Sequence, residues 1–385
     1  AYEKSYNERT TVRNIRRAQE CIRHYLDGAP MPGEAWEYQV VQQMLPMIGV
    51  DMLNQIAGQL VTDENLIISF QAPEDSAVVL PTEAEAIQFL AEVKNQEIEA
   101  PVEETIREKL VETAPKPGKI KHTQYDEHLG TTEWTLSNGV RVVVKPTTFK
   151  QDEILFQGMS LGGASQVDTE NLPSSMLAST IVDFSGLADM SMTDLQKALT
   201  GKNVSHSASI NNNTETVSGS STVKDLETLL QLNYLAFTAP RRDEEAFQTL
   251  MSILQSQLAN KDKNPKAVFS DSIQMMATNN SSRTVLENMT LVERVNLDKA
   301  LEIYKARFAN PADFVFTFVG NVDPQDETFK QLICTWLGGM KTSKKREQVI
   351  NHNVRAPQGI CKNYFTRNME TKTASNRIQY TSYEM

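Results

Sequence analysis

The 385-residue chain contains little cysteine and little histidine, which limits the sites that it can build. Its three cysteines, Cys21, Cys334 and Cys361, are odd in number and widely spaced, so neither a disulfide framework nor a cysteine-based zinc site is predicted. Cys21 and Cys334 lie in apolar helical patterns, which favours packing in a core. No two of the five histidines have the His-x-x-Glu-His or His-x-x-x-His spacing of a helical metal site.

Long hydrophobic runs and an excess of positive charge are also absent. A membrane-spanning helix needs about 18 or more apolar residues in succession, so no transmembrane segment is predicted. The net charge of −11 argues against nucleic acid as a partner, since binding to phosphates requires clustered Lys and Arg. The basic cluster at residues 341–346 is short and is interpreted as a solvated linker rather than a binding patch.

The polar residues that could carry chemistry form no strong catalytic pattern. His122 and His128 flank two acidic residues, and a solvated loop is favoured there over a weak surface metal site. His206 keeps strand parity with apolar neighbours and is predicted to be a half-buried strand residue. Neither a G-x-S-x-G serine elbow nor a phosphate-binding glycine loop is present.

One stretch organises the central part of the chain. Residues 131–146 alternate as a strand does, and Asn138-Gly139 interrupts them as a turn or bulge would. The apolar residues of one parity are Trp134, Leu136, Val140, Val142 and Val144. A second strand at 153–161 leads to a Gly162-Gly163-Ala164-Ser165 corner, and a helix is predicted to begin near Leu172-Pro173, because proline is tolerated in a first turn.

This order of elements resembles the pitrilysin/insulinase-type zinc metallopeptidases, also called inverzincins. In that family the same helix carries His-x-x-Glu-His, which places two zinc ligands and a general base on one helical face. The resemblance covers nearly the whole chain and implies an α+β fold of duplicated metallopeptidase-like domains, related as in a ferredoxin-like duplication. It implies a mostly antiparallel sheet with helices packed on one face.

The catalytic signature is replaced at the matching positions. Ser175 and Ser179 stand where the family has histidines, Ala178 stands in place of the glutamate base, and Gln255 aligns best with the third ligand. Neutral Ser and Gln are poor zinc ligands, and Ala cannot accept a proton. The chain is therefore expected to have no catalytic, cofactor-binding or metal-binding residues of its own, with zinc belonging to the parent protein.

Four regions are predicted. Residues 1–75 are the C-terminal part of a preceding domain, with three helices and a strand at 65–70. Residues 76–130 are a linker with short helices, 131–340 are a complete non-catalytic domain, and 341–385 open a further domain with strands at 359–365 and 377–383. Within 131–340, strands are predicted at 204–210, 214–221 and 314–319, and residues 48–70 are interpreted as a repeat of 295–318.

The resemblance implies a function with one alternative. The chain would form the substrate-chamber wall of a zinc metalloendopeptidase, opposite a catalytic half of the same polypeptide, and would be inactive alone. Its partner would be an unfolded peptide, its location a bacterial periplasm or envelope, and its uncovered ends would favour self-association. The alternative is an inactive binding or scaffold subunit. A His-x-x-Glu-His motif upstream in the full reading frame would separate the two.

Overall fold

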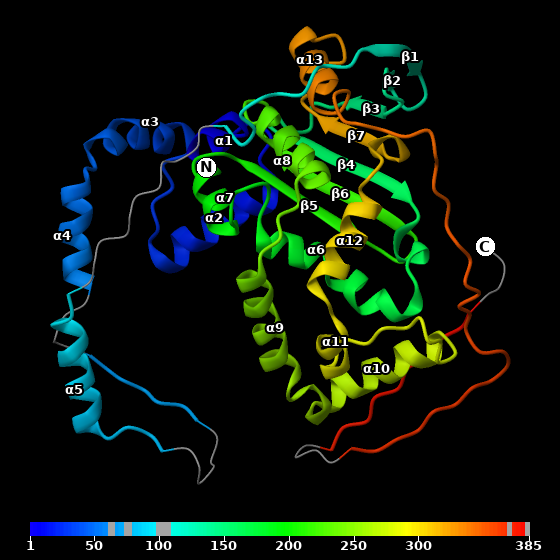
Figure 1. Cartoon of the computed structure of the whole chain (residues 1–385). Coiled ribbons are helices and arrows are strands. Elements are labelled where there is room, and N and C mark those ends of the chain that lie inside the picture. Colours follow the sequence, from blue (N-terminus) through cyan, green and yellow to red (C-terminus); the bar gives the residue numbers. More distant parts are fainter. Residues whose placement is uncertain (61–65, 73–78, 98–108, 368–371, 382–385) are drawn as a thin grey trace. The chain divides into compact units, whose positions relative to one another are not determined.

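The computed structural model describes residues 1–60, 66–72, 79–97, 109–367 and 372–381 (Figure 1). The chain divides into two compact units, each held together by contacts among its own residues. The larger unit contains residues 3–16 and the chain from 106 onward, and the smaller one contains residues 17–105. Among the described residues, the helices lack the length and apolar character needed to cross a bilayer.

The smaller unit is helical. Its elements are α2 (Asn14–Asp27, which begins in the larger unit), α3 (Glu34–Met44), the 3₁₀ turn η1 (Leu45–Met47), α4 (Val50–Leu60) and α5 (Glu83–Lys94). Thr82 and Glu85 form a reciprocal capping box at the start of α5. The apolar faces of these helices stay open: Trp36 is 56% exposed and Leu45 64%. Cys21 is exposed on α2, so its predicted core position is wrong, because none of the described elements of this unit covers that helix.

The larger unit is built on a seven-stranded sheet in the order β1-β2-β3-β7-β4-β6-β5. The strands are β1 (Ile120–Asp126), β2 (Thr131–Leu136), β3 (Arg141–Pro146), β4 (Ile154–Leu161), β5 (Val204–Ile210), β6 (Thr214–Ser221) and β7 (Val315–Gly320). Every pairing is antiparallel except that of β3 with β7. The last strand in sequence thus lies in the middle of the sheet and joins β3 to β4.

Helices cover one face of this sheet (Figure 1). They are α6 (Leu172–Ser185), α7 (Met192–Ala198), α8 (Leu226–Thr238), α9 (Glu244–Leu258), α10 (Pro265–Ala277), α11 (Met289–Arg294), α12 (Leu297–Arg307) and α13 (Glu327–Trp336), with the short α1 (Tyr2–Asn7) at the start of the chain. Short 3₁₀ turns lie at Gly163–Gln166, Thr169–Asn171, Lys261–Lys263 and Pro311–Asp313. The predicted α+β fold, with a mostly antiparallel sheet packed on one face, is confirmed.

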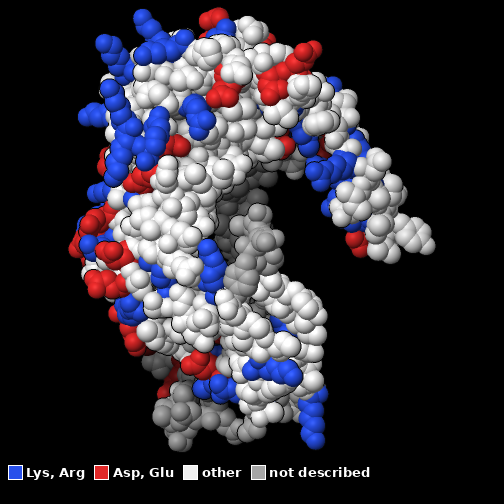
Figure 2. Space-filling view, turned by 90° about the vertical axis from the view of Figure 1, so that its right-hand side faces the viewer, with Lys and Arg blue, Asp and Glu red and all other residues white. Residues whose placement is uncertain are grey.

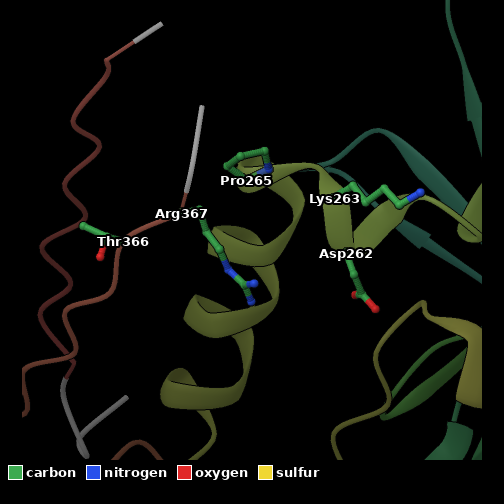
Figure 3. A pocket seen from close by; sticks show the side chains of 5 residues that line it. All are labelled: Asp262, Lys263, Pro265, Thr366 and Arg367. Atoms are coloured by element: carbon green, nitrogen blue, oxygen red, sulfur yellow. The ribbon is translucent and has the colours of Figure 1, made fainter. Parts of the chain in front are cut away.

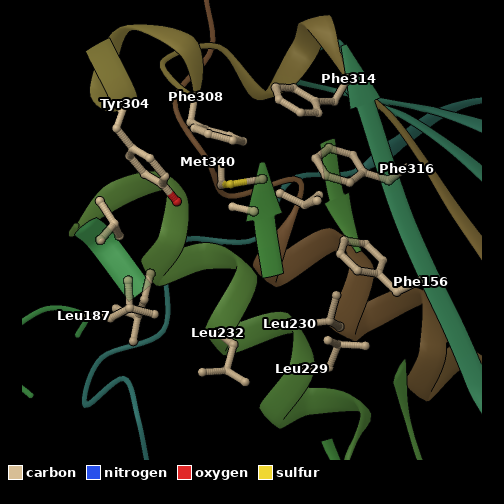
Figure 4. Close-up of a cluster of buried hydrophobic side chains, with 14 of the residues drawn as sticks. Phe156, Leu187, Leu229, Leu230, Leu232, Tyr304, Phe308, Phe314, Phe316 and Met340 are labelled. Atoms are coloured by element: carbon tan, nitrogen blue, oxygen red, sulfur yellow. The ribbon is translucent and has the colours of Figure 1, made fainter. Parts of the chain in front are cut away.

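The core lies between the sheet and its helices. Phe316 and Phe318 are fully buried and alternate with half-buried residues along β7, and Phe314, just before the strand, is also fully buried. The ring of Phe316 stacks on that of Phe156 with centroids 5.9 Å apart, and leucines of α8 pack below them (Figure 4). The five apolar residues that share parity in 131–146 are all at most 1% exposed, and they lie on a hairpin that turns at Asn138-Gly139.

Three predicted strands do not form. The described residues of the expected strands at 65–70, 359–365 and 377–383 have no regular secondary structure; position 65 and positions 382–383 fall outside the described residues. An apolar run becomes a strand only where a neighbouring strand can pair with its N–H and C=O groups. For the same reason the repeat matches only in part: α4 and α12 are both helices, but only the later copy continues into a strand.

The sheet also begins earlier than expected. Residues 120–126, placed in the linker by the sequence, form edge strand β1 and pair with β2. Leu110 is 6% exposed and its N–H donates to Gln231 Oε1 at 3.2 Å, so this part of the chain already belongs to the larger unit. β1 is an edge strand with mostly exposed residues, so apolar and polar residues alternate only weakly along IKHTQYD. Hydrophobic periodicity therefore could not predict this strand.

Gly163 is expected to be required for space rather than for its backbone angle. It has φ +57°, and an added Cβ would lie 2.3 Å from the carbonyl oxygen of Asn211. Gly130 has nearly the same φ, +59°, but its Cβ would meet only the flexible end of Lys145. Gly130→Ala should cost about 1–2 kcal/mol of unfolding free energy, and Gly163→Ala about 1–3 kcal/mol more because rigid backbone must move. Urea unfolding of both variants tests this, and equal losses would contradict it.

Candidate functional site

The Gly-Gly corner fixes where α6 begins. Its backbone N–H groups bond to the turn between β5 and β6: Gly162 donates to Asn213 at 2.9 Å, and Ala164 and Ser165 donate to Asn211 and Asn212 at 2.8 Å. The three successive asparagines of this turn therefore also hold the corner. Pro173 lies in the first turn of α6, and Gly186 (φ +88°) ends the helix.

A buried ion pair supports the corner from below. The Glu215 side chain is 1% exposed, and its Oε1 accepts a bond from the Gly163 N–H at 2.7 Å. Arg307 Nη1 lies 3.3 Å from the same oxygen and also binds Glu347 at 2.5 Å. Burial raises the pKa of Glu215, whereas the Gly163 bond and the Arg307 charge oppose the rise. Arg307 thereby links the Gly-Gly corner to Glu347, in the chain after α13.

The positions that match the catalytic signature lie on α6 within the core. Ser175 is 2% exposed and Ala178 fully buried, and the hydroxyls of Ser175 and Ser179 are buried without a hydrogen-bond partner among the described residues. A neutral hydroxyl can be buried at modest cost, whereas an unpaired imidazolium or carboxylate could not. Ser175 and Ala178 thus lie in the packed core, and Ser179 is half-buried beside them.

The fourth matching position is in a different environment. Gln255 is exposed on α9, a helix that packs against α6. Across the described residues, no three His, Cys, Asp or Glu side chains converge as metal ligands would. The donor set at Ser175, Ser179 and Gln255 has two hydroxyls and an amide, which does not fit the N, S or carboxylate ligands that zinc prefers.

Sequence reasoning missed one acidic residue on the same helix. Asp183 follows Ser179 by four residues, so it continues the 175–179 row by one more turn. Its side chain reaches the surface, but surrounding protein raises its pKa to about 6. Burial raises the pKa of Tyr304 on α12, and the charge of Asp183 adds to that effect, which places the two groups near each other. The i, i+4 spacing of Asp183 from Ser179 was the sequence feature that could have identified it.

Edge strand β5 is the polar border of the sheet. Ser205 and Ser207 are exposed and pair across the strands with Ser220 and Ser218, each at 3.0 Å between hydroxyl oxygens. Its outer edge offers backbone N–H and C=O groups that the sheet itself does not use. His206 is half-buried, as predicted, and its Nε2 lies 3.3 Å from Asn233 Oδ1.

Other surface features offer less. A depression beside α10 is lined by Asp262, Lys263, Pro265, Thr366 and Arg367 (Figure 3). In this view Asp262 and Lys263 point in different directions, so the charges do not converge on one ligand position.

His122 is exposed on β1, and His128 is exposed in the turn that follows. Figure 2 shows basic side chains gathered at the top of one face and acidic ones mixed with basic ones further down.

His206 should make stability depend on pH. Burial lowers its pKa from 6.5 to about 4. Between these values the unfolded chain binds a proton that the folded chain does not, so stability should fall as the pH is lowered from 6.5 toward 4. His206→Gln should flatten this part of the curve. Chemical unfolding of both proteins at each pH tests this. The variant is compared with the wild type because the raised pKa of Asp183 makes stability change with pH in the opposite direction. A slope unchanged by the substitution would contradict it.

Comparison with known proteins gives relatives of one kind. A zinc protease PQQL-like protein from Arabidopsis thaliana is 28% identical over 353 residues, which is 91% of this chain and 34% of the relative. The probable zinc protease PqqL of Escherichia coli K12 is 25% identical over 213 residues, or 55% of this chain and 22% of the relative. This chain therefore spans about one third or less of the curated relatives that it matches. No family model matches the sequence.

Solved structures agree with the fold. The periplasmic protease PqqL from Escherichia coli superposes with a TM-score of 0.58 at 20% identity, covering 92% of this chain and 39% of that one. The ferredoxin protease FusC, in complex with Arabidopsis ferredoxin, gives 0.55 at 18% identity, with 91% and 39% covered. The order of elements, the Gly-Gly corner and the Arabidopsis relative agree, so the predicted resemblance to the pitrilysin/insulinase-type metallopeptidases is confirmed.

Proposed function

We propose that this chain is the non-catalytic part of a zinc-dependent metalloendopeptidase and forms the wall of its substrate chamber. The observation that carries the proposal is the environment of Ser175, Ala178 and Ser179: neutral, closely packed side chains occupy the helix positions where the family has its ligands and base. A helix built in this way supports a domain but cannot activate water. The catalytic His-x-x-Glu-His would lie on a domain of the same polypeptide outside this chain.

The contact with substrate is proposed at edge strand β5. An unfolded peptide can add a further strand to a sheet edge, with main-chain hydrogen bonds supplying affinity for many sequences. The exposed serines beside this edge place no charge against an incoming chain. Ferredoxin is the bound protein in the FusC structure, and an unfolded polypeptide is the partner proposed here. A periplasmic or envelope location is proposed because the Escherichia coli PqqL structure is that of a periplasmic protease.

The chain alone should hold no tightly bound zinc and cleave no peptide. After dialysis against zinc and then against buffer, elemental analysis should find less than about 0.1 zinc per chain, since hydroxyl and amide donors are weak ligands. A quenched-peptide assay with added zinc should show no turnover, and the chelator-treated sample is its control. One zinc per chain with chelator-sensitive cleavage would overturn the proposal.

The same assays separate this role from that of an inactive scaffold subunit. If the full reading frame carries His-x-x-Glu-His, the complete protein should cleave the peptide that this chain leaves intact. A complete protein without that motif and without cleavage would favour the scaffold.

The exposed apolar faces of the helical unit should make the isolated chain self-associate. Trp36, Met44 and Leu45 are each more than half exposed, and faces of this kind favour association. Sedimentation at micromolar concentration should show dimers or larger species. The triple substitution Trp36→Gln, Met44→Gln and Leu45→Gln should shift the chain toward monomer, whereas Ser205→Gln and Ser207→Gln on the sheet should not. A monomeric wild-type chain would contradict this expectation.

A further inference from the structure

Residues 3–11 are held on the larger unit by an unusual contact. In the first sixteen residues only Glu8 is buried, at 5% exposure, and α1 buries none of its own residues. Apolar burial therefore contributes little to holding this segment. A charged group is costly to bury unless it is paired and hydrogen-bonded, so the surroundings of the Glu8 carboxylate decide whether the segment stays in place.

The turn between β3 and β4 surrounds this carboxylate with donors. The Asp152 N–H donates to Glu8 Oε1 at 2.5 Å, and Lys150 Nζ lies 3.6 Å from Oε2. The Thr11 hydroxyl closes the site from the segment itself, donating to Oε2 at 2.5 Å. Burial by itself would raise the pKa of Glu8, but the bonds from Thr11 and Asp152 and the charge of Lys150 bring it below its usual value. The site accordingly favours the ionised carboxylate.

The receiving turn is shaped by contacts that do not involve the segment. Asn321, just after β7, donates from Nδ2 to Gln151 O at 2.6 Å and from its N–H to Glu153 O at 3.0 Å. The Val223 N–H donates to Asp152 Oδ1 at 3.1 Å. Gly320 permits this approach, since an added Cβ would lie 2.2 Å from Glu153 O. The donors are thus positioned by the sheet before any carboxylate binds.

Further contacts of the segment lie nearer the surface. Asn7 Nδ2 donates to Asp152 Oδ2 at 2.9 Å, and Lys4 lies 3.6 Å from Glu153. Glu3 and Lys224 approach to 3.5 Å with both side chains largely exposed, a geometry that contributes little because water screens it. Glu8 is therefore the contact on which the attachment depends.

We propose that the β3–β4 turn is a carboxylate-binding site, occupied in cis by Glu8, which holds residues 3–11 as a releasable clasp. Its ligand class is a single carboxylate on a short peptide segment, recognised by a backbone N–H and a lysine. Glu8 is the one buried residue of the segment, so the state of its side chain decides whether the segment is docked or free.

The test is hydrogen exchange of the full chain carrying Glu8→Ala or Glu8→Gln, with Glu3→Gln as the matched control. Both Glu8 variants should increase exchange of residues 3–11 at least tenfold and speed tryptic cleavage after Arg9, while β4 and β7 keep their protection. Glu3→Gln should remain close to wild type. Unchanged exchange in Glu8→Ala, or an equal increase in Glu3→Gln, would overturn the proposal.

A second measurement tests recognition separately from folding. A synthetic peptide of residues 1–13 should bind the Glu8→Ala chain, whose turn is free, more tightly than the wild-type chain, whose turn is filled. A peptide with alanine in place of Glu8 should bind at least tenfold more weakly. Equal binding of the two peptides would show that the turn does not recognise the carboxylate, and would overturn the proposal even if the segment is released.

Discussion

The sheet of this domain depends on the insertion of its last strand. β7 pairs in parallel with β3 and antiparallel with β4, and these two pairings are the only strand contacts between β1-β2-β3 and β4-β6-β5 in the described sheet. More than 150 residues separate Pro146 from Val315, so the gain from pairing must outweigh a large loop-closure entropy. The buried phenylalanines Phe316 and Phe318 of β7, with Phe314 just before it, supply apolar burial at the centre of the core.

Both the corner before α6 and the turn that holds Glu8 take their positions from this arrangement. β4 begins beside the end of β7, where Gly320 and Asn321 shape the turn at 150–153. β4 ends at the Gly-Gly corner, which the β5–β6 turn and Glu215 fix in place. One strand therefore connects a carboxylate-binding turn at one end to the start of the serine-bearing helix at the other.

The serine-bearing helix is a packed element of the larger unit. With uncharged Ser175, Ala178 and Ser179, α6 packs tightly against α9 and α12. The fold needs only the apolar positions of that helix, such as Ile181 and Val182, and these remain buried. The family resemblance and the proposed loss of the metal ligands are consequently compatible, because separate residues carry them.

The sequence by itself determined the elements with strong local signals. The strands 204–210 and 214–221, the Asn138-Gly139 turn, the Thr82 capping box and the absence of ligands at 175 and 179 could all be read from periodicity and residue chemistry. Tertiary structure decided what depends on distant partners. It made edge strand β1 from a run with little alternation, left residues 66–70 without a strand, and buried Glu8 against Asp152, 144 positions away. Neighbours in space decide whether a backbone group is hydrogen-bonded and whether a side chain is buried. The local sequence pattern does not specify those neighbours.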